Sequence, residues 1–373
     1  MEHRRRGPAP RDVRPWPAGG SVSSQPIAEA GFGSASNGRR PRPFGRPDFG
    51  PERRADPRRA VLLRADTAGI LALLAVLVLH LLTRAGAAAS TPLPALLGLL
   101  LGLPHGAVDH LIPAWLSMKA RRWSRRVSLL LGYAATAGTG LLAYRAAPAA
   151  ALLGFLVLAI AHFGTGDEAF QAERDGRRVP PRPHGVLAYG APPVVFPLVL
   201  WRDQVDQLLE RVAAGSTVLL TTEVRAAALV LTVSAMAITA VQDVRGRRGR
   251  GLVQLGLLAT VFAIVPPALA FGVYFAAWHS LRHIARLLCA DPANTAHLRA
   301  GRLGPPLRRF ALHAAAPTAA VLISFALLTH HTGTAGVLPA TFALLAAVTV
   351  PHAVVVAWLD RSGRVQRVSP GVS

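Results

Sequence analysis

Long apolar segments separated by clusters of arginine restrict what this chain can fold into. Ten such segments are found, at residues 60–83, 92–116, 127–145, 149–170, 185–201, 225–243, 252–265, 267–289, 308–329 and 335–359. Most have about the 17–25 residues that an α-helix needs to cross a bilayer. Only helices and closed barrels satisfy every backbone polar group in lipid. The pattern therefore predicts an all-α, polytopic integral membrane helical bundle with about 8–10 transmembrane helices.

The charge distribution supports a membrane protein and argues against nucleic acid as a partner. Charged residues make up only 16% of the chain, against about 25% in average globular domains. The formal net charge of +22 would suit a phosphate backbone, but the arginines lie in short clusters between apolar segments. Aromatic residues are only 6% and are not interleaved with basic ones to stack bases.

The arginine clusters also predict an orientation in the membrane. They precede the first apolar segment, recur at 119–126, 174–182, 245–250 and 299–309, and follow Asp360. These are every second loop, so the positive-inside rule places both termini in the cytoplasm of a multi-pass protein of the cell membrane.

Three regions are predicted along the chain. Residues 1–58 are rich in Arg, Pro, Gly and Ser and bury too little apolar surface to offset the entropy of ordering, so a disordered cytoplasmic tail is expected. Residues 59–360 form the transmembrane helical catalytic domain, and 361–373 a short cytoplasmic tail.

Two histidines in the segment Trp278-His279-Ser280-Leu281-Arg282-His283 suggest a metal site. On a helix, residues four apart share one face about one turn apart, a spacing at which two imidazoles can bind one ion. Ionisable residues within a membrane are costly and are candidates for function. Cys289 is the only cysteine, so histidine and carboxylate must hold any metal.

Three further histidines lie in apolar surroundings: His105, His162 and His352. With His279 and His283 they lie between 12 and 17 residues from the expected outer ends of their segments. At about 1.5 Å of rise per residue, all five fall within about 8 Å of depth. We therefore expect the helices to converge on a buried metal site.

The neighbours of these histidines have more than one possible role. Asp109, four residues after His105, either orients His105 by accepting its N–H or binds the metal directly. For His352 three roles are open: a fifth metal ligand, a residue that hydrogen-bonds to a ligand, or a residue that lines a substrate channel. We expect Arg282 to point toward cytoplasmic water. Asp167 and Glu168 are solvated caps or catalytic groups.

Imidazole-rich sites without thiolate suit iron, copper, zinc or nickel. Zinc would suggest an intramembrane protease, but its H-E-x-x-H helix requires a glutamate where this chain has Ser280. Ferrous iron with open coordination positions would bind O2 beside a lipid-soluble substrate.

The motifs resemble those of the Brp/Blh-type β-carotene 15,15′-dioxygenases of bacteria and archaea. The matching pieces are Gly102-Leu103-Pro104-His105-Gly106-Ala107-Val108-Asp109-His110, His162-Phe163-Gly164 with Asp167, Trp278-His279-Ser280-Leu281-Arg282-His283, and Pro351-His352. The resemblance implies cleavage of β-carotene by O2 at its central double bond into two molecules of all-trans-retinal. It also implies a non-haem Fe(II) bound by four histidines, which are His105, His162, His279 and His283. The retinal would supply a microbial rhodopsin.

Two other functional classes remain open at this point. A membrane di-iron hydroxylase would need about eight or more histidines with pairs at the cytoplasmic face, whereas the single pair His330-His331 is expected outside. A transporter or a rhodopsin-assembly protein would use the histidines to relay protons or to bind a metal cargo.

Overall fold

The computed structural model describes residues 56–83, 91–116, 123–177, 181–333 and 336–368, and every regular element in these ranges is helical. The all-α prediction is therefore confirmed. The predicted N-terminal tail, residues 1–58, lies almost entirely outside the described residues. The predicted C-terminal tail begins inside a helix that continues to Val368, and residues 369–373 again lie outside the described ranges.

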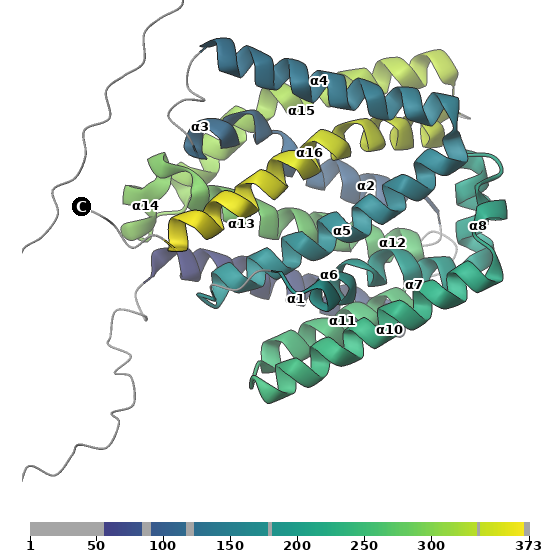
Figure 1. Ribbon diagram of the computed structural model, residues 1–373, viewed down its shortest axis with the longest axis horizontal. Helices are drawn as coiled ribbons and strands as arrows, with labels where there is room; N and C mark the ends of the chain where they lie inside the picture. Colours follow the sequence, from purple (N-terminus) through teal and green to yellow (C-terminus); the bar gives the residue numbers. More distant parts are fainter. Residues whose placement is uncertain (1–55, 84–90, 117–122, 178–180, 334–335, 369–373) are drawn as a thin grey trace, which may run out of the picture. The chain divides into compact units, whose positions relative to one another are not determined.

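Six long helices form most of the bundle (Figure 1). They are α1 (Pro57–Thr83), α4 (Trp123–Ala146), α5 (Pro148–Arg174), α10 (Thr222–Arg245), α15 (Gly304–Thr332) and α16 (Val337–Val368). With the segment Leu93–Leu116, the described part of the chain has seven stretches long and apolar enough to cross a membrane. An eighth is counted if α6 (Pro183–Gly190) and α7 (Pro192–Leu200), bent by 53° at their junction, form one span.

All ten predicted apolar segments are helical, but four of them are not simple spans, and the bent pair α6–α7 is one of these. Helix α11 (Gly249–Ile264) has only 16 residues. The segment predicted at 267–289 is divided into α12 (Pro267–Val273), the π-helix η6 (Tyr274–Ser280) and α13 (Leu281–Ala290). The count of seven, or eight with the bent pair, is therefore just below or at the lower end of the expected 8–10.

The span Leu93–Leu116 is also broken. Its parts are α2 (Leu93–Gly102), the 3₁₀ turns η3 (Leu103–Gly106) and η4 (Asp109–Leu111), and α3 (Ile112–Leu116). Pro104, at the start of η3, has no backbone N–H to continue the α-helical ladder, and its ring crowds the preceding turn. This break and the π-helix both lie where candidate histidines are found.

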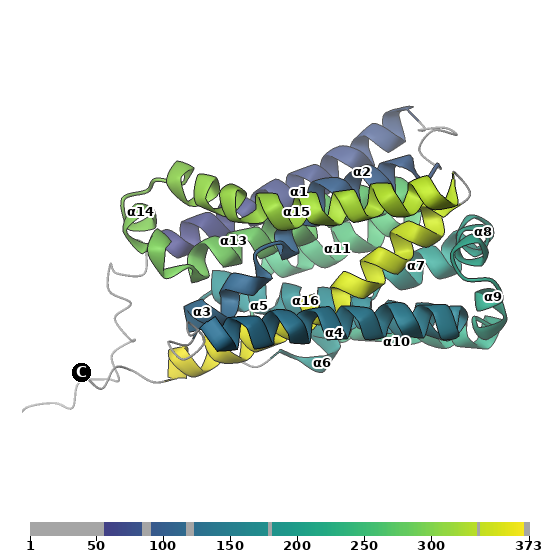
Figure 2. The ribbon, with the colours of Figure 1, turned by 90° about the horizontal axis from the view of Figure 1, so that it is seen from above.

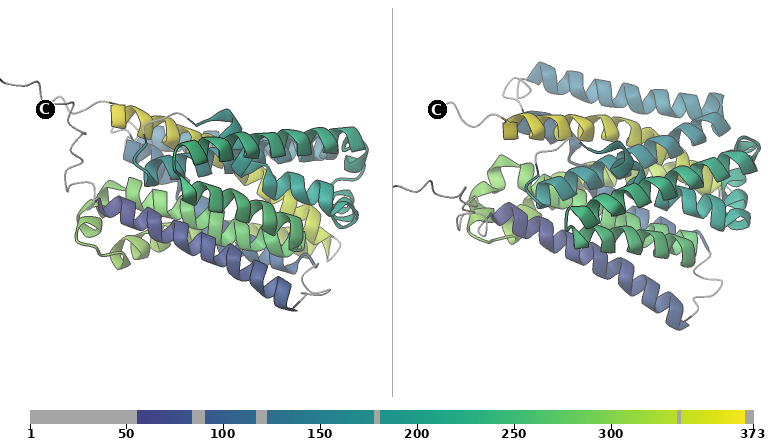
Figure 3. Two further views of the ribbon diagram at one scale, coloured as in Figure 1. Left: turned by 90° about the horizontal axis from the view of Figure 1, so that it is seen from below. Right: turned by 60° about the horizontal axis from the view of Figure 1, so that its bottom comes forward.

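The helices surround a central group of broken ones. Helix α16 crosses diagonally between α4 and α15 (Figure 2) and packs against both. On the other side, α1 covers α11 and α13, and α10 lies along α11 (Figure 3). The apolar stretch of α4 has no buried residue, so the side of α4 that faces away from α16 is placed to contact lipid.

Two glycines allow the broken helices to approach closely. A Cβ on Gly98 of α2 would overlap the backbone of Gly272 in α12, and a Cβ on Gly272 would overlap the backbone of Pro94. Small residues let helix backbones meet in this way within a membrane. The contact sets the distance between the segments that carry His105 and His279.

Short helices close the two ends of the bundle. They are α8 (Arg202–Val212) and α9 (Ser216–Leu219) at one end, and η7 (Pro292–Asn294) and α14 (Thr295–Arg299) at the other. The arginine-rich turn between α10 and α11 lies toward the same end as α14 (Figure 1). This end therefore carries one of the arginine clusters from which the orientation was predicted.

Candidate metal centre

Five buried imidazoles meet in the interior of the bundle. His105 comes from η3, His162 from α5, His279 from η6, His283 from α13 and His352 from α16. The His105 ring centroid lies 5.1 Å from that of His279, 5.7 Å from that of His283 and 4.9 Å from that of His352. The structure thus brings together all four predicted metal ligands and places His352 beside them as a fifth imidazole.

The remaining ring distances in the cluster are equally short. The His162 ring centroid lies 5.1 Å from that of His279 and 4.9 Å from that of His352. The His283 and His352 centroids are 5.3 Å apart. Each of the five side chains is between 4% and 7% exposed. Water therefore has little access to the point they surround.

His105 is fixed by its surroundings in a defined tautomer. Its Nδ1 lies 2.6 Å from the carbonyl oxygen of Gly102 and 3.2 Å from the Ser280 hydroxyl. Because a carbonyl oxygen can only accept, Nδ1 carries the proton. Nε2 of His105 then keeps a lone pair, as a metal ligand requires.

Unpartnered nitrogens show that the cluster suits a cation. Nε2 of His162, His279, His283 and His352 is buried and has no hydrogen-bond partner among the described residues. Buried polar atoms are normally paired, and each exception requires an explanation. A divalent metal ion would satisfy all four at once.

The ring spacing agrees with a shared ion. A metal–nitrogen bond of about 2.1 Å puts an imidazole centroid about 3 Å from the ion, so neighbouring ligand rings lie about 4.5–5.5 Å apart. Five of the six centroid distances given above fall in this range, and the sixth is 5.7 Å. The residues present therefore fit a metal held by imidazole.

Asp109 occupies a different place from the one expected. Its Oδ2 lies 2.7 Å from Nδ1 of His352, so it accepts from His352, whereas His105 donates to Gly102. The expectation of a His105–Asp109 pair assumed a continuous α-helix. In the 3₁₀ turns η3 and η4, residues four apart do not share a face, and Asp109 reaches α16 instead.

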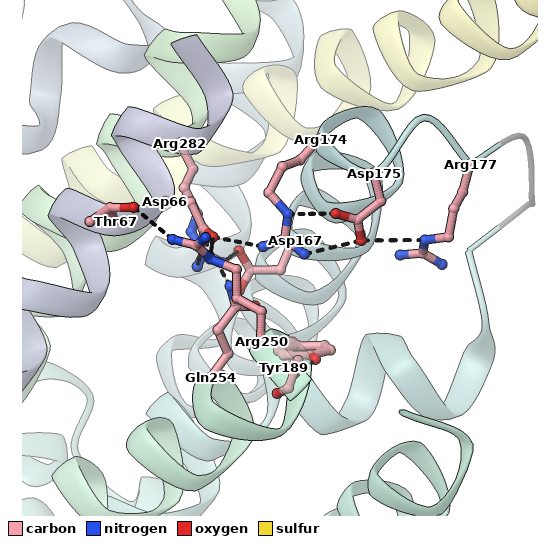
Figure 4. A network of polar contacts seen from close by, with 11 residues as sticks. Asp66, Thr67, Asp167, Arg174, Asp175, Arg177, Tyr189, Arg250, Gln254 and Arg282 are labelled. Carbon is pink, nitrogen blue, oxygen red and sulfur yellow. Dashed lines mark hydrogen bonds and ion pairs between the residues drawn. The ribbon is translucent and has the colours of Figure 1, made fainter. Parts of the chain in front are cut away.

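A second group of buried polar residues surrounds Asp66 (Figure 4). The carboxylate of Asp66 on α1 is contacted by Arg174, Arg250, Gln254 and Arg282. Arg282 also donates to Asp167 over 2.7 Å, and its guanidinium lies 3.4 Å from the centroid of a Trp278 ring. Trp278 donates to the same carboxylate over 2.9 Å.

The expectation of a solvated Arg282 is therefore wrong, and Asp167 and Glu168 are not solvated caps. Arg282 is only 2% exposed, and both acidic side chains are buried. The face of Arg282 differs from that of the histidines, as expected, but α1 and α5 cover it. Asp66 was not singled out, although an acidic residue in a long apolar segment is itself a signal.

Aromatic side chains border the histidine cluster. Phe275 lies edge-on to His105 with centroids 5.4 Å apart, and Phe163 lies 4.7 Å from His279. Tyr274 stacks near His279 at 6.5 Å. These rings give the centre apolar walls. His110, by contrast, is exposed and lies near the carbonyl of Ala107, outside the cluster.

Comparison with known proteins agrees with the motifs. A family model described as beta-carotene 15,15'-dioxygenase matches residues 96–360. A probable beta-carotene 15,15'-dioxygenase Blh of Halobacterium salinarum is 33% identical over 290 residues, covering 70% of this chain and 81% of that protein. A beta-carotene 15,15'-dioxygenase of an uncultured marine bacterium is 28% identical over 185 residues, covering 50% of this chain and 65% of that protein. No solved structure matches the chain.

Proposed function

Because the chain belongs to the beta-carotene 15,15'-dioxygenase family, we propose that it is a membrane-embedded non-haem iron oxygenase. It cleaves β-carotene at the central 15,15′ double bond with O2 and yields two molecules of all-trans-retinal. The observation that carries the proposal is the cluster of five buried imidazoles, four of whose Nε2 atoms have no hydrogen-bond partner among the described residues. The similarity to enzymes named for this reaction supports the substrate.

The proposed cofactor is Fe(II), held by His105, His162, His279 and His283. When bound, ferrous iron supplies the redox chemistry that makes O2 reactive toward a double bond. The central C=C bond and the O=O bond break and two C=O bonds form, so each retinal receives one oxygen atom and no further reductant is needed. The histidines bind as neutral imidazoles and leave the positive charge on the ion.

The other side chains position the substrate and exclude water. Phe163 and Phe275 offer apolar ring surfaces beside the histidines, against which a flat polyene can pack. Holding one double bond beside the metal converts the encounter into an oriented reaction. A site buried among membrane helices also favours a substrate that dissolves in the lipid bilayer.

We also propose the cell membrane as the location, with both termini in the cytoplasm. The arginine-rich segments in every second loop support this orientation. Retinal leaves the site as a hydrophobic aldehyde. A microbial rhodopsin in the same membrane is the proposed acceptor.

Expression in cells that accumulate β-carotene tests the reaction. Pigments are extracted and separated by HPLC for wild type, His283→Ala and, as a matched control, His110→Ala. Wild type and the control should bleach the cells and form retinal, and His283→Ala should form at least 100-fold less, about 2.7 kcal/mol in the barrier. Retinal formation by His283→Ala would contradict the metal assignment. Hydroxylated carotenoid in place of retinal would indicate a hydroxylase.

A further inference from the structure

The cluster contains one imidazole more than the four proposed ligands. His352 is 6% exposed and lies within 5.3 Å, centroid to centroid, of His105, His162 and His283. Its Nε2 has no partner among the described residues. One ligand nitrogen each from His105, His162 and His352 lie within 4.8 Å of one another. The His352 ring is thus as close to its neighbours in the cluster as the rings of the four proposed ligands are to one another.

Asp109 determines which nitrogen of His352 is free. A carboxylate accepts hydrogen bonds, so the 2.7 Å contact with Oδ2 places the proton of His352 on Nδ1. Nε2 then carries a lone pair directed away from Asp109. Asp109 is itself buried at 3% exposure, and the Tyr133 hydroxyl lies 3.5 Å from the same carboxylate oxygen.

A glycine and two ion pairs hold the Asp109–His352 pair in place. A Cβ added to Gly106 would lie 3.2 Å from Nδ1 of His352, which is tighter than an ordinary van der Waals contact. Glycine at this position therefore avoids a clash with the imidazole ring. Arg286 of α13 pairs with Asp360 of α16 and, over 3.0 Å, with Glu173 of α5. These ion pairs tie the helix of His352 to the helices of His283 and His162.

We propose that His352 is a fifth ligand of the metal and that Asp109 is the positioning residue that orients it. The proposal rests on the proposed function, because it concerns the same iron centre. A carboxylate behind a ligating imidazole fixes its tautomer and raises its basicity. It also brings a negative charge near an ion otherwise bound by neutral groups. With five imidazoles, an octahedral ion keeps one position open.

Cobalt(II) bound to the purified metal-free protein in detergent provides a test that does not depend on activity. The visible absorption bands of cobalt(II) gain intensity as the coordination number falls. Wild type, His352→Ala, His352→Gln, Asp109→Asn and the control His110→Ala are titrated with cobalt(II) and their spectra compared. Gln keeps a donor toward Asp109 but offers no imidazole nitrogen, so it separates ligation from folding.

We expect both His352 variants to bind one cobalt(II) more weakly than wild type and with more intense bands, and added imidazole to restore the wild-type spectrum. Asp109→Asn should keep the band intensity and bind about 10–100-fold more weakly. His110→Ala should match wild type. A wild-type spectrum and affinity in His352→Gln would overturn the fifth ligand while leaving the four-histidine site intact. No stoichiometric binding by wild type would instead refute the metal site itself.

Discussion

Single side chains decide which imidazole nitrogens are free to bind a metal. Gly102 accepts from His105 and Asp109 accepts from His352, so both rings turn the opposite nitrogen inward. The spacing of the histidines in the sequence was sufficient to predict the set that meets. It could not predict their hydrogen-bond partners, because these depend on the 3₁₀ turns and on contacts with residues far along the chain.

The closest backbone approach in the broken helices also depends on single residues. Gly272→Val would force the backbones of α2 and α12 apart and should destabilise the protein by about 1–3 kcal/mol. Because the same contact spaces His105 from His279, iron content should fall as well. Thermal unfolding and metal analysis check both effects.

The matched control is Gly132→Val on α4, where an added Cβ meets no atom within 4 Å. This variant should unfold near the wild-type temperature. Equal melting temperatures for Gly272→Val and Gly132→Val would show that the close approach of α2 and α12 does not contribute to the stability of the protein.

At the level of helices, the π-helix η6 and its junction with α13 position two of the proposed ligands, His279 and His283. π-Helical turns are rare and occur often at functional sites. Here Trp278 and Arg282 point from this segment into the polar network around Asp66, while His279 and His283 lie in the histidine cluster. Ion pairs thus fix one face of the segment, and the other face carries two of the proposed metal ligands.

Removal of Arg282 should therefore affect both stability and metal binding. Arg282→Met leaves the carboxylates of Asp66 and Asp167 with fewer charged partners in the interior, a change that costs about 3–5 kcal/mol when a buried pair is broken. We expect a lower unfolding temperature in detergent and less than stoichiometric iron. Arg299→Met, at an exposed position on α14, is the control and should behave as wild type.

An Arg282→Met protein with unchanged stability and full iron content would show that the network does not position the helix. The sequence could not reveal this network, since Asp66, Asp167 and Arg282 come from three separate helices. The helical period placed Arg282 on a different face from the histidines. Only the packing of α1 and α5 shows that this face is buried.

For the molecule as a whole, apolar composition and charge pattern predicted the fold class, and the structure confirms a helical membrane bundle. The number of spans was harder to predict. Hydropathy does not distinguish a spanning helix from a short or broken one such as α11 or α12–α13, because the lengths of these pieces depend on proline, glycine and tertiary packing.

Cysteine labelling tests the proposed orientation. In a background where buried Cys289 is replaced by alanine, Ala214→Cys lies in the exposed turn between α8 and α9, and Arg245→Cys at the exposed end of α10. A membrane-impermeant thiol reagent added to intact cells should label Cys at 214 by at least tenfold more than Cys at 245. Both should react after lysis. Stronger labelling at 245 than at 214 in intact cells would show that the orientation is the opposite of the one proposed.

The contact between Asp109 and His352 joins residues 243 positions apart in the chain, and this has a consequence for biosynthesis. The chain is made from its N-terminus, so η3 and α5 enter the membrane long before the last helix has been translated. Until α16 is inserted, Asp109 has no histidine to orient and one side of the histidine cluster stays open. Under the proposed function, a chain that stops before α16 offers iron only the four histidines of the earlier helices, so it should hold the metal more weakly than the complete chain.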